Sequence, residues 1–563
     1  MITSLKLKCG SGDETHTIDF SPDHVTIFLG PNNGGKSLLL REIEKWCMNG
    51  PFNDGKILSD LQIQWPSPES LIEEIRKFEL LPEPGETLQN DRIKYGKLDV
   101  VSNSRSTHTA SIENLKAWAN GSDQRGFKNY VSLYVLRLDA LARLHLVGER
   151  ETNDLQRPTT NVLNELFQND GKRRSLRKIL KEAFGRYYVI DPTGINKLRI
   201  RFADREPTES EEKSLTQEAI QFYKLQPLIS EFSDGVNAFT GLLMATISSS
   251  ARILLIDEPE AFLHPSLTSR LGLEVSSIMQ NRDGNLLAAT HSPKFLMGCI
   301  ESGKKLNIVR LTYDGKSKST VRLLPNEKIK SLMQQPLLRS VGVLDALFYN
   351  YVIVTEADAD RAFYQEINHR LNNFKPDWGI QNILFLNAHG KQEIWDIVRP
   401  LRELGVPTAA IVDIDIIKNG GQEWNKVLGS AFIPEARLSA LQNQRQTIAQ
   451  KFTDSGKDMK RDGGVDILSN SDRQACIDFF EDLASYGIFV VAKGEIESWL
   501  PRLEVSRAKN TWLKTIFEKL GSNPEDSSYV KPSDDDVWEF MSKAKKWLTD
   551  FDRKGIPSLS KEM

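Results

Sequence analysis

Short apolar runs that end abruptly in polar residues recur along the chain. Runs of four or five apolar residues without alternation are typical of strands buried on both faces of a parallel sheet. Helical periodicity follows most of them, so the pattern predicts an α/β protein made of repeated strand–helix units. The runs are Val25–Leu29, Ile253–Ile256, Asn285–Ala289, Tyr351–Thr355, Ile383–Leu386, Thr408–Val412 and Ile488–Val491.

The spacing of these runs predicts two domains joined by a connector. A chain of 563 residues is too long for one typical core. Further strands are predicted at Ile2–Lys8, Thr15–Phe20, Val131–Arg137, Leu306–Tyr313 and Thr320–Leu324. The predicted parts are a first α/β domain at 1–325 with a helical insertion at about 138–186, a connector at 326–349, a second α/β domain at 350–500 with a polar insertion at about 419–485, and a helical segment at 501–563.

The first apolar run leads into Gly30-Pro-Asn-Asn-Gly-Gly-Lys-Ser37, which predicts a nucleotide-binding P-loop. Its glycines let the backbone turn N–H groups toward phosphate oxygens. Lys36 would pair with the β- and γ-phosphates, and the Ser37 hydroxyl would hold Mg²⁺. The alternative is an ordinary glycine-rich turn. The predicted ATP-contacting residues of this loop are Gly30, Asn33, Gly35, Lys36 and Ser37.

Two later strands end in residues that suit ATP hydrolysis. Asp257 and Glu258 follow a fully apolar strand, where adjacent acids are costly unless a cation lies beside them. Asp257 can bind Mg²⁺ through water, and Glu258 can orient and deprotonate the attacking water. His291, after the third strand, could reach the γ-phosphate. The P-loop, Asp257-Glu258 and His291, in this order, resemble the ATPase heads of the ABC class, close to those of SMC, RecF and OLD proteins.

In that class, a signature motif from a second head completes the ATP site. The candidate here is Glu231–Phe239, with Ser233 and Gly235 at the positions expected to meet the partner's γ-phosphate. It lacks the usual Ser-Gly-Gly-Gln, and the alternative is an ordinary helix N-cap at Ser233 or Asp234. The glutamine loop of the class is not placed. The resemblance implies a homodimer or a higher homo-oligomer formed through the heads.

The second predicted domain concentrates acids at its strand ends. Glu356, Asp358 and Asp360 crowd one strand end, where they repel one another unless a divalent metal neutralises them. Asp413 and Asp415 follow another strand, and residues two apart in an extended strand point the same way. The alternative is an α/β domain with solvated acids at its strand ends.

This acidic set resembles a Toprim domain, the metal-dependent module of topoisomerases, primases and OLD-family nucleases. Glu356 matches its first acid, although Ala357 stands where the family has glycine. The region of Lys493 and Glu497 resembles the Gly-x-x-Glu segment of OLD-type Toprim domains. The resemblance implies Glu356 and Asp413 as catalytic residues and Lys493 as a transition-state cation. The implied ligands for Mg²⁺, or for Mn²⁺ or Ca²⁺, are Glu356, Asp358, Asp360, Asp413, Asp415 and Glu497.

Composition limits the remaining possibilities. The net charge of −3 gives no reason to infer a nucleic-acid partner, so any such partner must be argued from local sites. The most basic stretch, 172–186, reads as an amphipathic helix with a solvated basic face, or alternatively as a surface that tracks phosphates. Four scattered cysteines indicate neither zinc nor disulfides. Without a signal peptide or a long apolar window, we expect a cytoplasmic protein with no membrane partner.

A head followed by a Toprim module resembles the OLD family, including the nuclease subunit of Gabija-type antiphage systems. The resulting hypothesis is an ATP-hydrolysing, metal-dependent nuclease that cuts DNA under control of its head, in phage defence and with a second protein subunit. One alternative is an abortive-infection effector that cuts RNA such as tRNA. Another is a non-cutting ATPase switch that binds nucleic acid or recruits a partner. Trp512, Trp538 and Trp547 are expected to be packing residues rather than base-stacking platforms.

Overall fold

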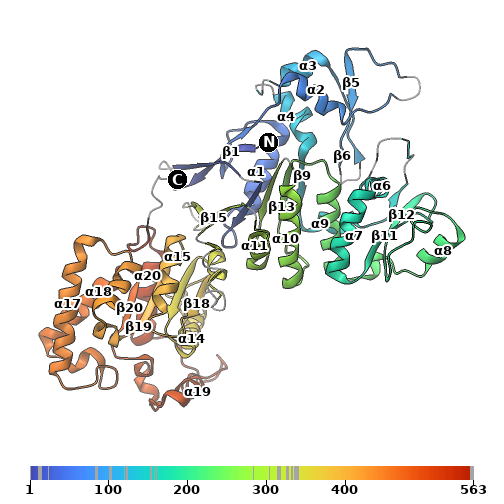
Figure 1. Cartoon of the computed structure of the whole chain (residues 1–563). Helices are drawn as coiled ribbons and strands as arrows, with labels where there is room; N and C mark the ends of the chain where they lie inside the picture. Colours follow the sequence, from blue (N-terminus) through green and yellow to red (C-terminus); the bar gives the residue numbers. More distant parts are fainter. Residues whose placement is uncertain are drawn as a thin grey trace. The chain divides into compact units, whose positions relative to one another are not determined.

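The computed structural model divides the chain into two compact units, Met1–Asn326 and Glu327–Met563 (Figure 1). It describes residues 2–557 except 10–15, 23, 83–85, 100–103, 120, 122–123, 153–154, 157–158, 160, 283, 304, 314–318, 325–326, 328, 331–333 and 335–341. Half of the predicted connector, 326–349, therefore lies outside the described residues. No helix of the described part combines the length and apolar composition needed to cross a membrane.

The first unit is organised around a six-stranded sheet. Its strand order is β16-β15-β3-β14-β13-β9, and all neighbours are parallel except the hairpin β15–β16. Every residue of β3, β13 and β14 is buried, as expected for a sheet covered on both faces. The strands are β3 (Val25–Leu29), β9 (Val135–Leu138), β13 (Ile253–Asp257), β14 (Asn285–Ala289), β15 (Asn307–Tyr313) and β16 (Ser319–Leu324).

Helices and a second sheet cover the central sheet. Helix α1 (Lys36–Asn49) shares one core with alternate residues of β3, β13 and β14 and with the antiparallel sheet β2-β1-β4. Helix α10 (Pro265–Gln280) contacts β3 and β14 and packs along α11 (Pro293–Glu301). The small sheet confirms both N-terminal strand predictions, and its strands are β1 (Ile2–Cys9), β2 (His16–Phe20) and β4 (Leu58–Ile63).

The described residues between 64 and 134 form short strands and helices that belong to the same core as α1. The predicted strand Val131–Arg137 is wrong in its first half, where the chain forms the 3-10 helix η1 (Val131–Tyr134) before β9. The strand begins at Val135 because that residue is the first to pair with β13, opposite Ile253. The other elements are α2 (Pro68–Arg76), β5 (Arg92–Tyr95), β6 (Leu98–Asp99), β7 (Ser104–Arg105), β8 (His108–Ser111), α3 (Ile112–Trp118) and α4 (Gln124–Asn129).

The predicted insertion at about 138–186 is mostly helical, as expected, and the two-residue strand Arg150–Glu151 interrupts its helices. That strand, β10, belongs to the antiparallel sheet β10-β12-β11, whose other two strands follow the predicted range. Alternating buried residues Leu198, Ile200 and Phe202 make β12 an amphipathic strand. Its elements are α5 (Ala140–Leu146), β10 (Arg150–Glu151), α6 (Val162–Gln168), α7 (Asp170–Phe184), β11 (Tyr187–Asp191), β12 (Lys197–Ala203), α8 (Gln217–Lys224) and the following η2 (Ile229–Glu231).

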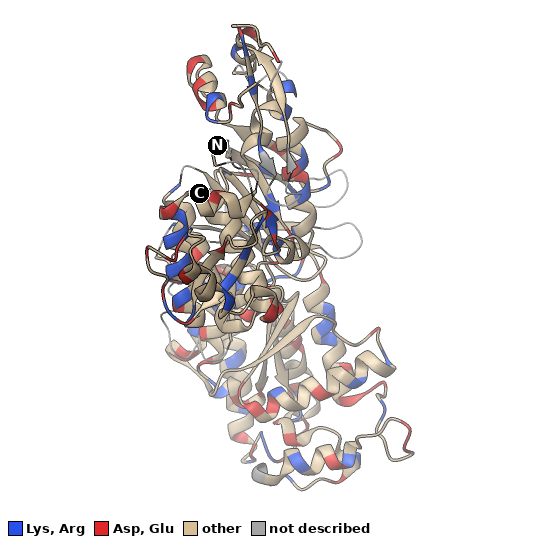
Figure 2. Cartoon of the chain, turned by 90° about the vertical axis from the view of Figure 1, so that its right-hand side faces the viewer, with Lys and Arg blue, Asp and Glu red and all other residues tan. Residues whose placement is uncertain are grey.

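Helix α7 carries the most basic stretch of the chain. The predicted amphipathic helix is confirmed, with Leu176 and Leu180 buried. Arg173 and Arg177 are also buried and form ion pairs with Glu212. Two of the basic residues are therefore structural cations rather than part of a solvated face. Elsewhere Lys and Arg are interspersed with Asp and Glu along the helices (Figure 2).

The second unit contains a four-stranded, all-parallel sheet with the order β18-β17-β19-β20. Helix α14 (Asp358–Phe374) contacts β17 and β18, α15 (Ile394–Glu403) contacts β19, and α18 (Asn470–Ala484) contacts β20. The strands are β17 (Tyr351–Thr355), β18 (Ile383–Asn387), β19 (Thr408–Asp413) and β20 (Ile488–Val491), and the short η3 (Asp345–Phe348) precedes them.

The segments expected to be a polar insertion and a C-terminal cap belong to this unit's core. The insertion consists of helices with buried Trp424, Phe452 and Phe479, so it contributes apolar core in addition to its polar surface. Trp512, Trp538 and Trp547 lie in one apolar cluster with α14, which confirms them as packing residues. The elements are η4 (Ile414–Lys418), α16 (Gly421–Ser430), α17 (Glu435–Asp454), η5 (Gly464–Ile467), η6 (Ile496–Ser498), η7 (Pro501–Leu503), α19 (Lys509–Leu520) and α20 (Asp536–Thr549).

One fully buried arginine links several loops of this unit. Arg402, on α15, donates to the carbonyl oxygens of Thr408 at 2.8 Å, Tyr486 at 2.8 Å and Gly555 at 3.1 Å. Burial lowers the pKa of its guanidinium to about 9. Since buried carbonyls without a donor are costly, Arg402 stabilises the sheet and the C-terminal segment together.

We predict that Arg402→Met lowers the free energy of unfolding of the second unit by roughly 3 kcal/mol or more, because several buried carbonyls lose their donor. The matched control is Arg399→Met on the same helix, whose side chain is 57% exposed. This control should change stability by less than about 1 kcal/mol. Urea unfolding followed by tryptophan fluorescence measures both, and equal effects of the two variants would contradict the role of Arg402.

Candidate functional site

The P-loop joins the end of β3 to α1 through strained backbone. Gly30 has φ +138°, and a Cβ there would lie 1.9 Å from the carbonyl oxygen of Leu311. Gly35, at φ +89°, is the N-cap of α1 and gives its first turn no side-chain cap. Asn33 also has positive φ, at 62°. The open N–H groups at the start of α1 therefore remain available to an anion.

Lys36 and Ser37 are the first residues of α1 and face the end of β13. Lys36 is buried, and its Nζ donates to the carbonyl oxygens of Gly30 at 2.8 Å and Pro31 at 2.7 Å. Burial lowers the pKa of Lys36 to about 8, against the opposing effect of nearby acids. Ser37 Oγ donates to Asp257 Oδ1 at 2.9 Å. The loop and the acidic strand end, far apart in sequence, thus meet in one site.

Asp257 is buried at the end of β13, and the exposed Glu258 follows it with φ 48°. Arg143 holds this strained turn, since its guanidinium donates to the carbonyl oxygens of Asp257 at 3.1 Å, Glu258 at 2.7 Å and Pro259 at 2.9 Å. Arg143 is fully buried, on α5. Sequence reasoning missed Arg143, because no local pattern connects it with residues more than one hundred positions later.

Glu260 ties the acidic turn to the end of β14. It accepts hydrogen bonds from Thr290 Oγ1 at 2.7 Å and from the backbone N–H of His291 at 2.6 Å. Burial raises the pKa of Glu260. Burial also lowers the pKa of His291 to about 4, and the charge of Lys36 adds to that shift. The imidazole is therefore neutral near pH 7. Glu260 was also missed, although its place three residues after Asp257 is a local signal.

Two neighbouring clefts share the P-loop. The first, of about 650 Å³, is lined by residues 32–38, Arg41, Glu258 and His291, so it brings the predicted loop residues together with the predicted base and histidine. The second, of about 480 Å³, lies against residues 33–35 and is lined by Ile57, Leu311 and Tyr313 among others. A polar cleft beside a more apolar one matches the shape of a nucleotide, with phosphates in the first and a base in the second.

Ser233 and Gly235 lie at the start of α9 (Asp234–Ser248). Ser233 occupies the N-cap position, but its side chain makes no capping hydrogen bond. A Cβ on Gly235 would lie 2.9 Å from the carbonyl oxygen of Phe262, in the loop that follows Asp257 and Glu258. Phe262 is 47% exposed, with φ 69°. The hydroxyl of Ser233 is thus not used as a cap, and an exposed aromatic residue lies beside it.

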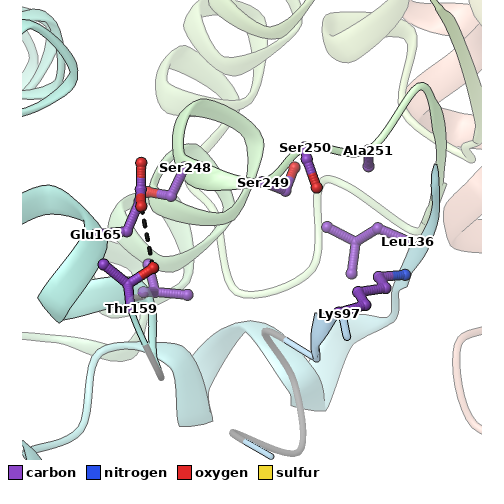
Figure 3. A pocket seen from close by; sticks show the side chains of 9 residues that line it. Lys97, Leu136, Thr159, Glu165, Ser248, Ser249, Ser250 and Ala251 are labelled. Atoms are coloured by element: carbon purple, nitrogen blue, oxygen red, sulfur yellow. Dashed lines mark hydrogen bonds between the residues drawn. The ribbon is translucent and has the colours of Figure 1, made fainter. Parts of the chain in front are cut away.

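A small cavity of about 90 Å³ lies elsewhere in the first unit, between β9, α6 and the residues after α9 (Figure 3). Glu165 accepts a hydrogen bond there from Thr159 Oγ1 at 3.1 Å. No predicted site residue lines this cavity.

In the second unit, acidic side chains gather where β17, β19 and β20 end. Burial raises the pKa of Glu356, and the charge of Asp413 adds to it. Burial also raises the pKa of Asp413. For Asp360, burial and the charge of Asp413 raise the pKa to about 7, and Glu356 and Glu497 contribute to that shift. Since β17 pairs with β19 and β19 with β20, all in parallel, their carboxyl ends are neighbours, and the mutual effects indicate that Glu356, Asp360, Asp413, Asp415 and Glu497 lie near one another.

Asp413 and Asp415 meet for a different reason from the one predicted. The strand ends at Asp413, and Asp415 lies in η4, so the two do not share one face of an extended strand. Both still approach the ammonium of Lys460, at 2.5 Å from Asp413 Oδ2 and 3.7 Å from Asp415 Oδ2. Gly494 O accepts the N–H of Ile414 at 3.0 Å and fixes the turn.

Two predicted residues point elsewhere. Asp358 forms an ion pair with Arg361 at 2.8 Å and accepts from Asn387 Nδ2 at 3.0 Å, so the structure does not bring it to the cluster as a ligand. Lys493 pairs with Asp536 at 3.1 Å on α20 instead of facing the acids. For Asp358 the reason is local, since the first turn of α14 directs Asp360 inward and Asp358 toward Arg361. For Lys493 the reason is tertiary, since Asp536 comes from the C-terminal part of the chain.

Three residues of the cluster were missed by sequence reasoning. Lys460 comes from the insertion, and Glu495, which is buried, has its Oε2 at 4.0 Å from Lys460 Nζ. Lys391 Nζ lies 3.1 Å from Asp415 Oδ1. Glu495 stands two residues before Glu497, which was a usable signal, whereas nothing local marks Lys460.

The donor set suits a hard divalent ion. Mg²⁺ and Mn²⁺ prefer carboxylate oxygens, and Glu356 Oε2 is buried without a hydrogen-bond partner in the described structure. Glu356, Asp413 and Asp415 are the residues that would hold the ion. Among the described residues, no three acidic, histidine or cysteine side chains already form a metal-binding group. In this arrangement the ammonium of Lys460 lies between the carboxylates.

Two family models match the chain. The first, AAA_21, is described as an AAA domain and names the AbiEii toxin of a Type IV TA system; it matches residues 58–297. That range includes Asp257, Glu258 and His291 but not the P-loop. The second, the TOPRIM domain of overcoming-lysogenization-defect-like proteins, matches residues 347–415 and includes Glu356, Asp360 and Asp413. No curated protein matches the chain.

Among solved structures, the matches include heads of SMC proteins. The SMC head domain from Thermotoga maritima is 12% identical with a TM-score of 0.30, covering 57% of this chain and 99% of its own. An SmcHead bound to the C-winged helix domain of ScpA is 12% identical with a TM-score of 0.32, covering 58% and 99%. The Smc head from Pyrococcus furiosus is 13% identical with a TM-score of 0.29, covering 59% and 98%.

The strand order and the family matches together confirm the predicted fold class, a P-loop ATPase domain followed by a Toprim domain with a parallel sheet. The ATPase residues meet at one edge of the first sheet, and the acidic cluster lies at the corresponding edge of the second. Together the two matches give an AAA-type ATPase domain followed by an OLD-like TOPRIM domain, in the order that the sequence predicts.

Proposed function

We propose that this protein binds and hydrolyses ATP and cleaves DNA with a divalent metal, and that its ATPase domain controls the cleavage. The observation that carries the proposal is the convergence of Glu356, Asp413 and Asp415 at one sheet edge, in a chain whose other unit joins Ser37 to Asp257. Buried carboxylates gathered in this way are costly unless a cation neutralises them. The two family matches support an ATP-dependent nuclease in general.

In the ATPase site, the N–H groups of the P-loop and Lys36 would bind phosphate oxygens, and Ser37 and Asp257 would hold Mg²⁺. Glu258 would orient and deprotonate the attacking water, since its carboxylate lies in the same cleft as the P-loop. Neutral His291 would donate its ring N–H to an oxygen of the γ-phosphate. Arg143 and Glu260 would act as positioning residues through the backbone that they bind.

In the Toprim site, a divalent ion would activate the attacking water and stabilise the leaving oxygen. Glu356, Asp413 and Asp415 would hold it, with Asp360 and Glu497 close by. Lys493 is no longer the proposed transition-state cation, because it pairs with Asp536. Lys391 and Lys460 are the ammonium groups that face the acids.

The free Ser233 hydroxyl and the exposed Phe262 support a homodimer or larger homo-oligomer in which one ATPase domain completes the site of another. An antiphage role, a cytoplasmic location and a second subunit, as in Gabija-type systems, belong to the same proposal through family resemblance. A specific observation also supports a second candidate, a non-cutting ATPase switch. In the present arrangement Lys460 rather than an open space lies between Asp413 and Asp415.

The first prediction concerns cleavage. Supercoiled plasmid with Mg²⁺ or Mn²⁺ should be nicked by the wild-type protein, and Asp413→Ala should reduce the rate on the order of 100-fold or more, because a metal ligand is lost. Asp358→Ala is the matched control and should retain most of the activity, because Asp358 binds Arg361 instead. Nicking is followed on agarose gels, with and without ATP.

Lys36→Ala in the same assay gives the direction of control by ATP. If the wild-type protein does not nick the plasmid but still hydrolyses ATP, the result would favour an RNA substrate or the non-cutting switch. An assay with an RNA oligonucleotide would separate these two. Loss of nicking in Asp358→Ala but not in Asp413→Ala would contradict the assignment of Asp413, rather than Asp358, as a metal ligand.

The second prediction concerns ATP hydrolysis. Glu258→Gln keeps the shape of the side chain but removes the base, so kcat should fall by about 100-fold or more while nucleotide binding persists. The control Glu301→Gln, at the exposed end of α11, should leave both unchanged. Phosphate release and fluorescent-nucleotide binding measure the two quantities. A normal kcat in the Glu258→Gln protein would contradict the role of Glu258 as the general base.

The third prediction concerns His291. Its folded-state pKa is lowered from 6.5 to about 4, so protonation favours the unfolded chain. The corresponding stability is fully present above about pH 6.5 and is lost as the pH falls toward 4. Histidine NMR, assigned with His291→Gln, should show this low pKa, and Lys36→Met should raise it. A pKa of 6.5 or above would contradict the burial of the imidazole.

A further inference from the structure

The insertion between η4 and β20 delivers one lysine into the acidic cluster. Lys460 lies between α17 and η5, and its Nζ approaches Asp413 at 2.5 Å, Asp415 at 3.7 Å and Glu495 at 4.0 Å. The side chain is 20% exposed. One ammonium therefore contacts carboxylates from two different strand ends.

The backbone around Lys460 is fixed rather than loosely placed. The carbonyl oxygen of Lys460 lies so close to Gly494 that a Cβ on Gly494 would be 2.2 Å from that oxygen. The N–H of Lys460 donates to Asp458 Oδ1 at 2.9 Å, and Met459 is buried beside it. The N–H of Val465 donates to the carbonyl oxygen of Ala492 at 2.9 Å, just after β20. The lysine is thus presented to the acids by a segment built onto the turn that carries Glu495.

The two other nearby lysines do not occupy this position. Lys391 approaches Asp415 through the other carboxylate oxygen, Oδ1. Lys493 pairs with Asp536. Among the ion pairs of the described residues, Lys460 shares Asp413 and Asp415 with the expected ligand set of the metal.

A lysine ammonium and a divalent ion cannot both use the same oxygen atoms at short distance, because the two cations repel each other where water screens them little. We propose that Lys460 is an internal counter-cation that competes with the divalent ion for Asp413 and Asp415, so that metal binding requires its ammonium to leave these carboxylates. This inference rests on the metal site of the proposed function, but not on the cleavage of any nucleic acid.

The test is metal affinity in the full-length protein. Lys460→Met should strengthen Mn²⁺ binding, measured by isothermal titration calorimetry and Mn²⁺ EPR, on the order of tenfold, because the competing charge is gone. The same variant should melt at a lower temperature in chelated buffer, and Mn²⁺ should restore more stability to it than to the wild type. The matched control is Lys457→Met, an exposed lysine on the same segment, which should behave as the wild type.

A second measurement uses the wild-type protein and does not depend on the variant folding. Reductive methylation of lysines, read by mass spectrometry, should label Lys460 faster at saturating Mn²⁺ than in chelated buffer, while Lys457 should not change. Unchanged or slower labelling of Lys460 would overturn the proposal. So would unchanged or weaker Mn²⁺ binding by a folded Lys460→Met protein.

The outcomes also separate this inference from the proposed function. Tighter Mn²⁺ binding by Lys460→Met, with no plasmid nicking by the wild-type protein, would support the competition and count against DNA cleavage. Nicking with equal Mn²⁺ affinity in both proteins would keep the nuclease and remove the competition. Absence of Mn²⁺ binding by both proteins would overturn the metal site and the competition together.

Discussion

The cost of taking carboxylates out of water governs both candidate sites. Asp257 and Asp413 each stand at the end of a buried parallel strand, where the surrounding sheet excludes solvent. Such a charge persists only with a hydrogen-bond donor or a cation beside it. Asp257 has the Ser37 hydroxyl, and Asp413 has the Lys460 ammonium. Each site is therefore completed by an element that is distant in sequence from its strand.

Buried arginines hold the backbone that carries these acids. Arg143 binds the carbonyls of the turn at Glu258, whose φ of 48° is unfavourable for a residue with a side chain. Arg402 binds carbonyls at the start of β19, just before β20 and in the C-terminal segment. A guanidinium can serve several carbonyls at once. The same chemistry thus holds a strained turn in one unit and joins separate loops in the other.

The motifs of the ATPase site follow from local order in the sequence. A strand, a glycine-rich turn and a helix must produce a P-loop, and parallel strands bring Asp257 and His291 to the same edge. In the second unit the same logic predicts Glu356 and Asp413. It fails for Asp358, which pairs with Arg361 one helical turn away, and for Lys493, which pairs with Asp536 on the distant helix α20.

The sequence by itself therefore determined the two α/β units, the strand ends that carry chemistry and the types of residue found there, since these depend on local periodicity and motif spacing. Tertiary structure decided which side chains neutralise the acids. Arg143 and Lys460 reach their partners across more than forty residues. Which cation lies beside a buried carboxylate depends on how inserted segments pack, and the free energy of that packing is shared among contacts far apart in the chain.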